Sequence, residues 1–356
     1  MTNLEDLPIR SDLVGQVPYG APQIDVSIKL NVNENTHGIP ESVALKIVEK
    51  TAHAAIGLNR YPDREFLALR GAFANFLGHD LTAEQIWAAN GSNEVLQQFF
   101  QAFGGPSRKA ISFGPTYSMY PNLARTTLTE YKELPRQQDF SLSADYVAEV
   151  IGSEKSDIVI LCSPNNPTGT PIDLDVIDAA YQAFDGMVLV DEAYQEFSTG
   201  PSAISLLAAR PRLVVSRTMS KAFAFAGARV GYMAADPAVV DAMRIVRLPY
   251  HLSALTQAAA LAALDSGEEL LASIPQIISQ RNRISAGVGK LGLRAYPSQS
   301  NFVLVEGFED PKAVFESLLA KEIIVREVSI PGCLRITAGT EAETTKLLGE
   351  LAILLD

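Results

Sequence analysis

One short segment near the middle of the chain combines an amine, two hydroxyls and a guanidinium. It is the run Arg217-Thr218-Met219-Ser220-Lys221-Ala222-Phe223, and Arg229 follows eight residues after the lysine. A carbonyl cofactor that carries a phosphate needs such a set, because the amine forms a Schiff base while hydroxyls and guanidinium hold the phosphate. Such residues also cluster on ordinary surfaces, but the small apolar residues 222–227 favour a buried loop over a solvated lysine.

Two other motifs follow strand-like stretches. The glycine in Gly91-Ser92-Asn93 precedes a helical pattern, so backbone N–H groups at a helix N-terminus would face a ligand anion. A plain helix cap is the alternative. The run Ser163-Pro164-Asn165-Asn166-Pro167-Thr168-Gly169 predicts a fixed turn that holds an asparagine amide at the sheet edge, where it can bind a ligand oxygen. A tight capped turn without a ligand is the alternative there.

An aspartate ends another apolar run, in Asp191-Glu192-Ala193-Tyr194. A carboxylate in that position is costly unless it is paired, and a protonated pyridine nitrogen is a fitting partner. The pair would keep the ring cationic and able to accept electrons, while Tyr194 could donate to a phenolic oxygen on the ring. A structural aspartate that caps the next turn is the alternative. Lys221 would then be the Schiff-base amine and, once released, the general acid and base.

Strands and helices alternate through most of the chain, which predicts a mostly parallel sheet with helices on both faces. The expected strands are residues 85–89, 110–113, 157–161, 187–190 and 213–216, with helices from Pro40, over 94–103 and from Asp173. Ligands bind outside the carboxyl ends of parallel strands. The four segments described above fall at those ends, which favours one shared site over four unrelated motifs.

The pattern changes around Pro249, which predicts an arm over residues 1–38, a large domain over 39–250 and a small α+β domain over 251–356. The small domain is expected to contain helices over 252–290 and 311–320, strands over 301–305, 323–326 and 334–337, and a final helix from Glu341. Residues 287–292 match the G-x-G-x-x-G pattern but lie at a predicted helix end, so we interpret them as a helix stop.

The chain has 356 residues, and 29 basic against 41 acidic residues give it a net charge of −12. Such a protein is a poor candidate for binding nucleic acid or an anionic membrane. Two cysteines in strand-like runs and an acidic start without signal-peptide features suit a reducing cytoplasm. The uncharged stretch 248–264 predicts a buried helix, and the histidines show no metal-ligand spacing.

On these motifs the chain resembles the fold-type I, pyridoxal-phosphate-dependent aminotransferases, class II, over nearly its whole length. The matching segments are residues 30–35, 59–62, 90–94, 115–120, 163–169, 191–194, 217–223 and 334–337. Within that family it is similar to the members that convert L-histidinol phosphate and 2-oxoglutarate to imidazole-acetol phosphate and L-glutamate in histidine biosynthesis. The expected reaction is therefore a ping-pong transamination.

The resemblance implies a role for each site residue. Lys221 forms the internal aldimine, Asp191 pairs with the pyridine nitrogen, Asn166 and Tyr194 contact the ring oxygen, and Tyr117 stacks on the ring. The cofactor phosphate is held by Ser92, Asn93, Thr218, Ser220 and Arg229, and by Tyr61 of the neighbouring subunit in a homodimer. Substrate binding falls to Asn166, to Arg335 for the glutamate carboxylate, and to Arg335, Arg326 and Tyr19 for the substrate phosphate.

Three other functions fit parts of this pattern. An aromatic amino-acid aminotransferase would need Arg335 but not Arg326. A decarboxylase of a phosphorylated amino acid would keep the cofactor and change the reaction. A cofactor-binding regulatory protein without catalysis usually carries a DNA-binding region, which the acidic composition disfavours.

Overall fold

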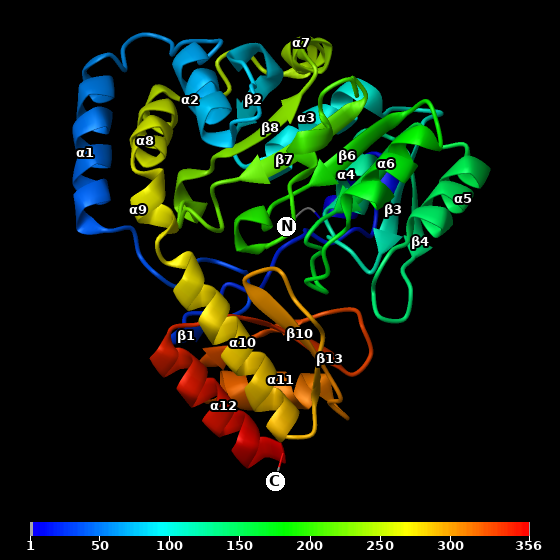
Figure 1. Cartoon of the computed structure of the whole chain (residues 1–356), viewed down its shortest axis with the longest axis vertical. Coiled ribbons are helices and arrows are strands. Elements are labelled where there is room, and N and C mark those ends of the chain that lie inside the picture. The colour runs from blue at the N-terminus through cyan, green and yellow to red at the C-terminus, as the bar shows by residue number, and fades with distance from the viewer. Residues whose placement is uncertain (1–2, 356) are drawn as a thin grey trace.

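A seven-stranded sheet forms the centre of the larger part of the molecule (Figure 1). The computed structural model describes residues 3–355. The strand order is β2 (Ile86–Ala89), β8 (Gly231–Ala235), β7 (Leu213–Thr218), β6 (Met187–Asp191), β5 (Ile158–Cys162), β3 (Lys109–Gly114) and β4 (Glu130–Pro135). The strands from β7 to β4 are parallel, and β8 runs antiparallel to both of its neighbours. The predicted mostly parallel sheet is confirmed.

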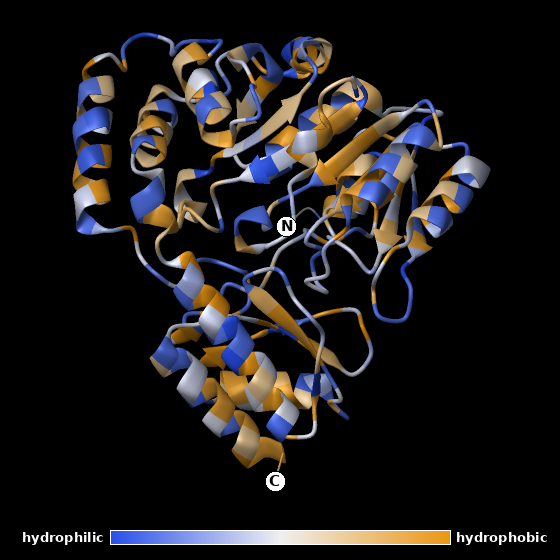
Figure 2. Cartoon of the chain, viewed as in Figure 1, coloured by the Kyte–Doolittle hydropathy of each residue, from blue (hydrophilic) through white to orange (hydrophobic). Residues whose placement is uncertain are grey.

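The middle strands form because they are unbroken runs of branched apolar residues. Strands β5 and β7 are buried along their whole length, and only Met187 of β6 is partly exposed, so both faces of the sheet are covered. Figure 2 shows these strands largely in the hydrophobic colour. The covering helices are α2 (Leu67–Leu77), α3 (Ser92–Phe103), α4 (Tyr120–Thr126), α5 (Ala144–Glu154), α6 (Leu174–Gln182) and α7 (Pro237–Val246).

Two further helices stand at one edge of the larger part, α1 (Glu41–Ile56) beside α8 (Ala254–Asp265) (Figure 1). The predicted helical region 252–290 is divided into α8, α9 (Gly267–Leu271) and α10 (Ile274–Lys290). Alanines of α8 belong to the core of the larger part, whereas Ile284 of α10 belongs to a second core. The packing therefore favours a domain boundary within α10, and the boundary at residue 250 stays a prediction.

The smaller part is an antiparallel sheet covered by helices. Its strands, in order, are β12 (Arg326–Glu327), β13 (Cys333–Thr337), β10 (Phe302–Glu306) and β9 (Arg294–Ala295), and α10, α11 (Pro311–Leu319) and α12 (Glu341–Leu355) complete it. The arm joins this part, because β1 (Ile28–Lys29) pairs in parallel with β11 (Ile323–Ile324). Gly292 takes a φ of +79° just after α10, so the predicted helix stop is confirmed.

Cys162 and Cys333 are free and buried, and both lie in strands, as their strand-like sequence runs predicted. No helix in the described part of the chain combines the length and the apolar character that a membrane span requires.

A buried ion cluster ties the ends of β6 and β7 together. Arg217 lies 2.8 Å from Glu192 and 3.0 Å from Glu196, and the exposed fraction of each side chain is below a tenth. Neighbouring residues of a strand point to opposite faces of the sheet. The cluster therefore braces the sheet from the face opposite to Asp191 and Ser216.

We expect Arg217→Met to lower the free energy of unfolding by about 3–5 kcal/mol, because it leaves two buried carboxylates without their cation. Arg210→Met is the matched control, since Arg210 pairs with the partly exposed Asp178 and should cost below about 1 kcal/mol. Urea unfolding of the cofactor-free proteins, followed by circular dichroism, measures both. Equal midpoints for the two variants would contradict a bracing role for the cluster.

Candidate active site

A cavity of about 690 Å³ opens at the carboxyl ends of β5, β6 and β7 and is closed on its far side by β12 and β13. It brings together residues that lie up to three hundred positions apart in the sequence. Its lining includes Tyr19, Ser92, Asn93, Tyr117, Asn166, Asp191, Tyr194, Thr218, Ser220, Lys221, Arg229, Arg326 and Arg335. Of the residues expected at the site, Tyr61 alone lies elsewhere in the described chain.

Lys221 follows β7 in a loop whose next two residues, Ala222 and Phe223, are fully buried. Its Nζ donates a hydrogen bond to the carbonyl oxygen of Val32, at 2.9 Å. Burial lowers the pKa of this amine to about 8, with further lowering by the charges of Arg335 and Arg229. About a tenth of the amine is therefore uncharged at pH 7, far more than of an ordinary lysine, and this fraction can attack a carbonyl.

Asp191 ends β6 and is 3% exposed. Its Oδ2 accepts a hydrogen bond from the Tyr120 hydroxyl at 2.9 Å, and its Oδ1 accepts one from the Ser216 hydroxyl at 3.2 Å. Burial raises the pKa of this carboxyl to about 6, against the two hydroxyls, which lower it. At pH 7 the group is still mostly an anion, buried beside a cavity large enough to hold a cationic ring.

Glycines shape the place where a phosphate would bind. Ser92 and Asn93 are the first two residues of α3, so the predicted turn at 91–93 shortens to Gly91, whose φ is +86°. A Cβ on Gly91 would overlap the Arg229 guanidinium, and a Cβ on Gly231 would overlap the backbone of Ser92. Backbone N–H groups at the start of a helix and a guanidinium are thus drawn into contact, which suits a bound dianion.

Hydroxyl groups complete this phosphate cup, and Thr218 and Ser220 both line it. Thr218 Oγ1 accepts a hydrogen bond from the backbone N–H of Ser220 at 3.1 Å, which fixes the loop between β7 and Lys221. Arg229 adopts a left-handed backbone conformation, with φ +55°, and lines the same cavity.

The walls of the cavity are held by side-chain hydrogen bonds. The Tyr117 hydroxyl donates to Asn93 Oδ1 at 3.1 Å, and Asn33 Nδ2 donates to the Tyr194 hydroxyl at 2.9 Å. In the turn 163–169 the two asparagines differ, because Asn165 is buried and bonded to Pro115, Thr116 and Thr168, whereas Asn166 faces the cavity. Asn165 therefore builds the turn, and Asn166 is the residue available to a ligand.

Two arginines oppose each other at the far wall. Arg326 and Arg335 are direct partners in the antiparallel pair β12–β13, so their side chains project from the same face of that sheet. Arg335 donates to Asn166 Oδ1 at 2.5 Å and to the carbonyl oxygen of Asn31 at 2.6 Å, while its buried Nε has no partner among the described residues. Burial, and then the charge of Arg326, lowers its pKa to about 10. This pair is suited to binding an anion.

Two tyrosines mark the entrance and the outside. Tyr19 of the arm is 45% exposed and meets the Tyr117 ring edge-on, with ring centroids 6.5 Å apart. Tyr61 is 80% exposed and stacks on Tyr250, away from this chain's own cavity.

Sequence reasoning assigned no role to Val32, Asn33, Tyr120 or Ser216, which contact the key side chains directly. Val32, Asn33 and Tyr120 lie within the matching segments, and Ser216 directly precedes one of them. The direction in which each side chain points could not be predicted from residue type and spacing.

The donor set fits pyridoxal phosphate. A poorly hydrated amine of lowered pKa suits its aldehyde, a buried carboxylate suits its ring nitrogen, and the glycine-built cup suits its phosphate. The residues that would hold it are the lining residues between Ser92 and Arg229 given above.

The pKa of Lys221 predicts how fast the cofactor-free protein takes up pyridoxal phosphate. Only the unprotonated amine attacks, so the rate should rise about tenfold per pH unit below pH 8 and level off above about pH 9. Stopped-flow absorbance measures this profile, with free lysine as the control. A rate that keeps rising through pH 10, as for an ordinary lysine, would contradict the lowered pKa.

Comparison with known proteins agrees with this geometry. The family described as "Aminotransferase class I and II" matches residues 25–351. The chain is 57% identical to a histidinol-phosphate aminotransferase from Paenarthrobacter aurescens (strain TC1), over all of this chain and 97% of that protein. It is 50% identical to one from Thermobifida fusca (strain YX), over 96% and 94%.

Among solved structures, histidinol-phosphate aminotransferase from Sinorhizobium meliloti in complex with pyridoxal-5'-phosphate matches with a TM-score of 0.88 at 25% identity. The match covers 99% of each chain. The predicted fold-type I architecture is thereby confirmed. The chain belongs to the class I and II aminotransferase family.

Proposed function

We propose that this protein transfers the amino group of L-histidinol phosphate to 2-oxoglutarate with pyridoxal phosphate, as a histidinol-phosphate aminotransferase of histidine biosynthesis. The observation that carries the substrate assignment is the pair Arg326 and Arg335, placed opposite each other in the cavity that holds Lys221. The relatives at 57% and 50% identity bear that name. The two buried, unpaired cysteines suit a cytoplasmic location.

The residues of this chain divide the chemistry among them. When bound, pyridoxal phosphate supplies an aldehyde for the amino group and a ring that withdraws electrons. Lys221 Nζ takes the α-proton of the substrate and returns it, which its pKa near 8 allows at neutral pH. Asp191 would keep the ring nitrogen protonated, and the hydroxyl of Tyr194, oriented by Asn33, would donate a hydrogen bond to the ring oxygen.

The arginine pair distinguishes the substrates. Like charges placed directly opposite in a sheet repel each other, and an anion between them removes that cost. A phosphate dianion can accept hydrogen bonds from both guanidiniums, and the carboxylates of 2-oxoglutarate can use the same donors in the second half-reaction. An aromatic amino acid offers one carboxylate and leaves the second arginine unused, which disfavours the aromatic alternative.

Arg326→Ala should lower kcat/KM for histidinol phosphate by about 30- to 150-fold, since it removes one charge-assisted contact. The loss on phenylalanine should be several-fold smaller. Arg294→Ala is the matched control, because Arg294 lies on the same small sheet and pairs with Glu306 at the surface. Equal losses on both substrates would remove Arg326 from phosphate binding.

A homodimer completes the proposed site, and an exposed apolar surface supports it. Tyr61 stacks on Tyr250 with ring centroids 4.3 Å apart, and both rings face outward. Other exposed apolar side chains lie on α1 or close in sequence to the two tyrosines: Leu45, Val48, Ile56, Leu58, Ile245 and Leu248. Exposed large apolar side chains of this kind suit contact with a partner subunit.

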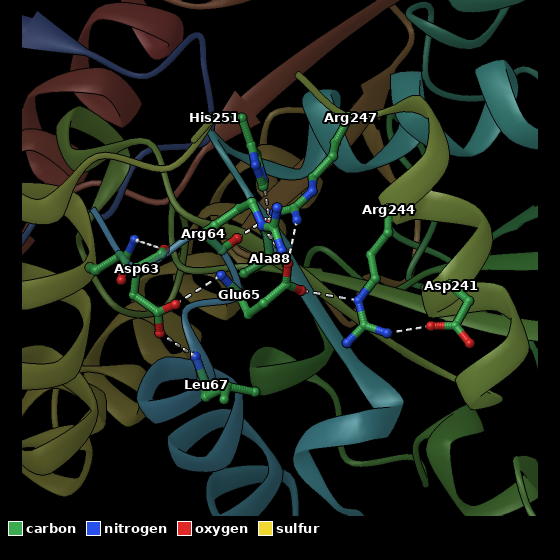
Figure 3. Close-up of polar contacts among 10 residues, drawn as sticks. Asp63, Arg64, Glu65, Leu67, Ala88, Asp241, Arg244, Arg247 and His251 are labelled. Atoms are coloured by element: carbon green, nitrogen blue, oxygen red, sulfur yellow. Dashed lines mark hydrogen bonds and ion pairs between the residues drawn. The ribbon is translucent and has the colours of Figure 1, made fainter. Parts of the chain in front are cut away.

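Hydrogen bonds hold the two segments that follow the stacked tyrosines, at Glu65 and at His251 (Figure 3). Glu65, four residues after Tyr61, accepts hydrogen bonds from Arg244 at 3.1 Å and from Arg247 at 2.5 Å. The ring of His251, next to Tyr250, bonds the carbonyl oxygen of Ala88 at 2.9 Å, close to the phosphate cup. The Tyr61 ring is thus exposed on the outside of its own subunit. In the proposed homodimer it would contact the cofactor phosphate of the second subunit.

Mixing two inactive variants tests the shared site. Lys221→Ala should abolish turnover, and Tyr61→Ala should weaken cofactor binding and activity. A mixed dimer keeps one complete site, with Lys221 from one subunit and Tyr61 from the other. Random reassociation should therefore restore about a quarter of the activity, because half of the dimers are mixed and each has one intact site.

In the control mixture, Ile353→Ala at an exposed apolar position of α12 replaces Tyr61→Ala, and this mixture should show only the activity of the sites that already hold Lys221. No gain over the sum of the separate variants, at concentrations where gel filtration shows exchange, would rule out the contribution of Tyr61 across the interface.

A further inference from the structure

A buried hydrogen bond that the site description leaves without a function holds the Asp191 carboxylate. Tyr120 is the first residue of α4 and is fully buried. Its hydroxyl donates to Asp191 Oδ2 at 2.9 Å, while the Ser216 hydroxyl donates to Oδ1. Each oxygen of the carboxylate thus has one fixed donor, and each retains a lone pair for a partner in the cavity.

We propose that Tyr120 is a positioning residue that, together with Ser216, fixes the Asp191 carboxylate and sets how strongly it holds the positive charge on the cofactor ring. The inference rests on the cofactor assignment above and adds to it a residue that tunes the electron-withdrawing power of the ring.

The surroundings of Asp191 leave these two hydroxyls as its main neutral donors. Ser216 and Cys162 are its register partners on β7 and β5, so both lie on the same face of the sheet. The Cys162 thiol is a weak donor, and burial raises its pKa to about 12, so it stays neutral. Glu192 is braced on the opposite face by Arg217.

The remaining groups near the carboxylate are also neutral at physiological pH. Burial raises the pKa of Tyr120, of Tyr117 and of Tyr194 far above the ordinary value, so none of the three ionises. Arg136 is a buried cation beside Cys162, and its guanidinium is directed to the carbonyl oxygens of Phe113, Phe140 and Cys162. Lys221 and Arg335 line the same cavity as Asp191, but neither forms an ion pair with it among the described residues. The Asp191 carboxylate therefore relies on the two hydroxyls and on the backbone N–H of Ala193 until a cationic ring binds.

The consequence for a bound cofactor has a definite sign. A carboxylate that loses a donor becomes a stronger base and draws the shared proton away from the ring nitrogen. The ring then withdraws electrons less strongly, and the nitrogen that joins Lys221 to the cofactor becomes more basic. Removing the Tyr120 hydroxyl should thus raise the pH at which the yellow chromophore changes colour and slow proton removal from the substrate.

Tyr120→Phe is the direct test, because it deletes the hydroxyl and keeps the buried ring. The measurement is an absorbance titration of the purified holoenzyme without substrate. We expect the chromophore pKa to rise by about 0.5 to 1 unit, a part of the free energy of the lost charge-assisted hydrogen bond, because the effect reaches the chromophore through the ring. Ser216→Ala should shift it in the same direction by less, since its bond is longer.

Tyr131→Phe is the control, because its hydroxyl, in a partly buried side chain, bonds Ser112 at 2.5 Å and forms no hydrogen bond with Asp191. It should leave the chromophore pKa unchanged. In Tyr120→Phe, kcat should fall about 5- to 20-fold with little change in KM, whereas a general loss of packing would raise KM and release cofactor.

The failures of the two proposals are distinguishable. A protein that forms no yellow chromophore, or that borohydride does not label at Lys221, overturns the proposed function itself. A yellow Tyr120→Phe holoenzyme whose chromophore pKa stays level or falls overturns the role of Tyr120 alone. If Tyr120→Phe does not fold, the chromophore pKa of Ser216→Ala is measured instead, and a value that stays level or falls overturns the proposal.

Discussion

The burial of an ionised carboxylate at the end of β6 is the constraint on which the rest of the site depends. Asp191 is almost inaccessible to water, and burial alone would favour its neutral form. Hydroxyls from α4 and β7 offset part of that cost, and a cationic ring in the cavity supplies the remainder. The anion is therefore matched to a ligand that the chain does not itself contain.

The buried cations of the cavity are likewise matched to a ligand, in this case an anionic one. Lys221 and Arg335 share one cavity, with Arg229 and Arg326 close enough to lower their pKa values. Glu34 offsets part of this repulsion at Lys221, but none of these four cations forms a salt bridge among the described residues. Such an arrangement is costly in the protein alone and favourable around phosphates and carboxylates. By contrast, Arg217 on the other face of the sheet has two carboxylates, and its task is to stabilise the sheet end.

The arm connects the small part of the chain to the active site in the large part. Its strand β1 adds to the small part through β11, and the residues that follow pass directly over the site. The backbone carbonyls of Asn31 and Val32 accept from Arg335 and Lys221, and Asn33 orients Tyr194. Residues 31–33 therefore contact Lys221, Arg335 and Tyr194. A movement of the small part relative to the central sheet would change all three contacts.

The sequence by itself determined the central strands, the parallel sheet and the residues at its carboxyl ends, because apolar runs and turn motifs act locally. Lys221, Asp191 and Asn166 were identifiable since each directly follows or ends such a run. Tertiary structure decided the rest. The opposition of Arg326 and Arg335 depends on a strand register, the placement of the Tyr61 ring depends on its stack with Tyr250, and the contact of Tyr120 with Asp191 joins residues seventy-one positions apart. Such contacts arise from packing between distant segments, for which neither residue type nor spacing along the chain carries a signal.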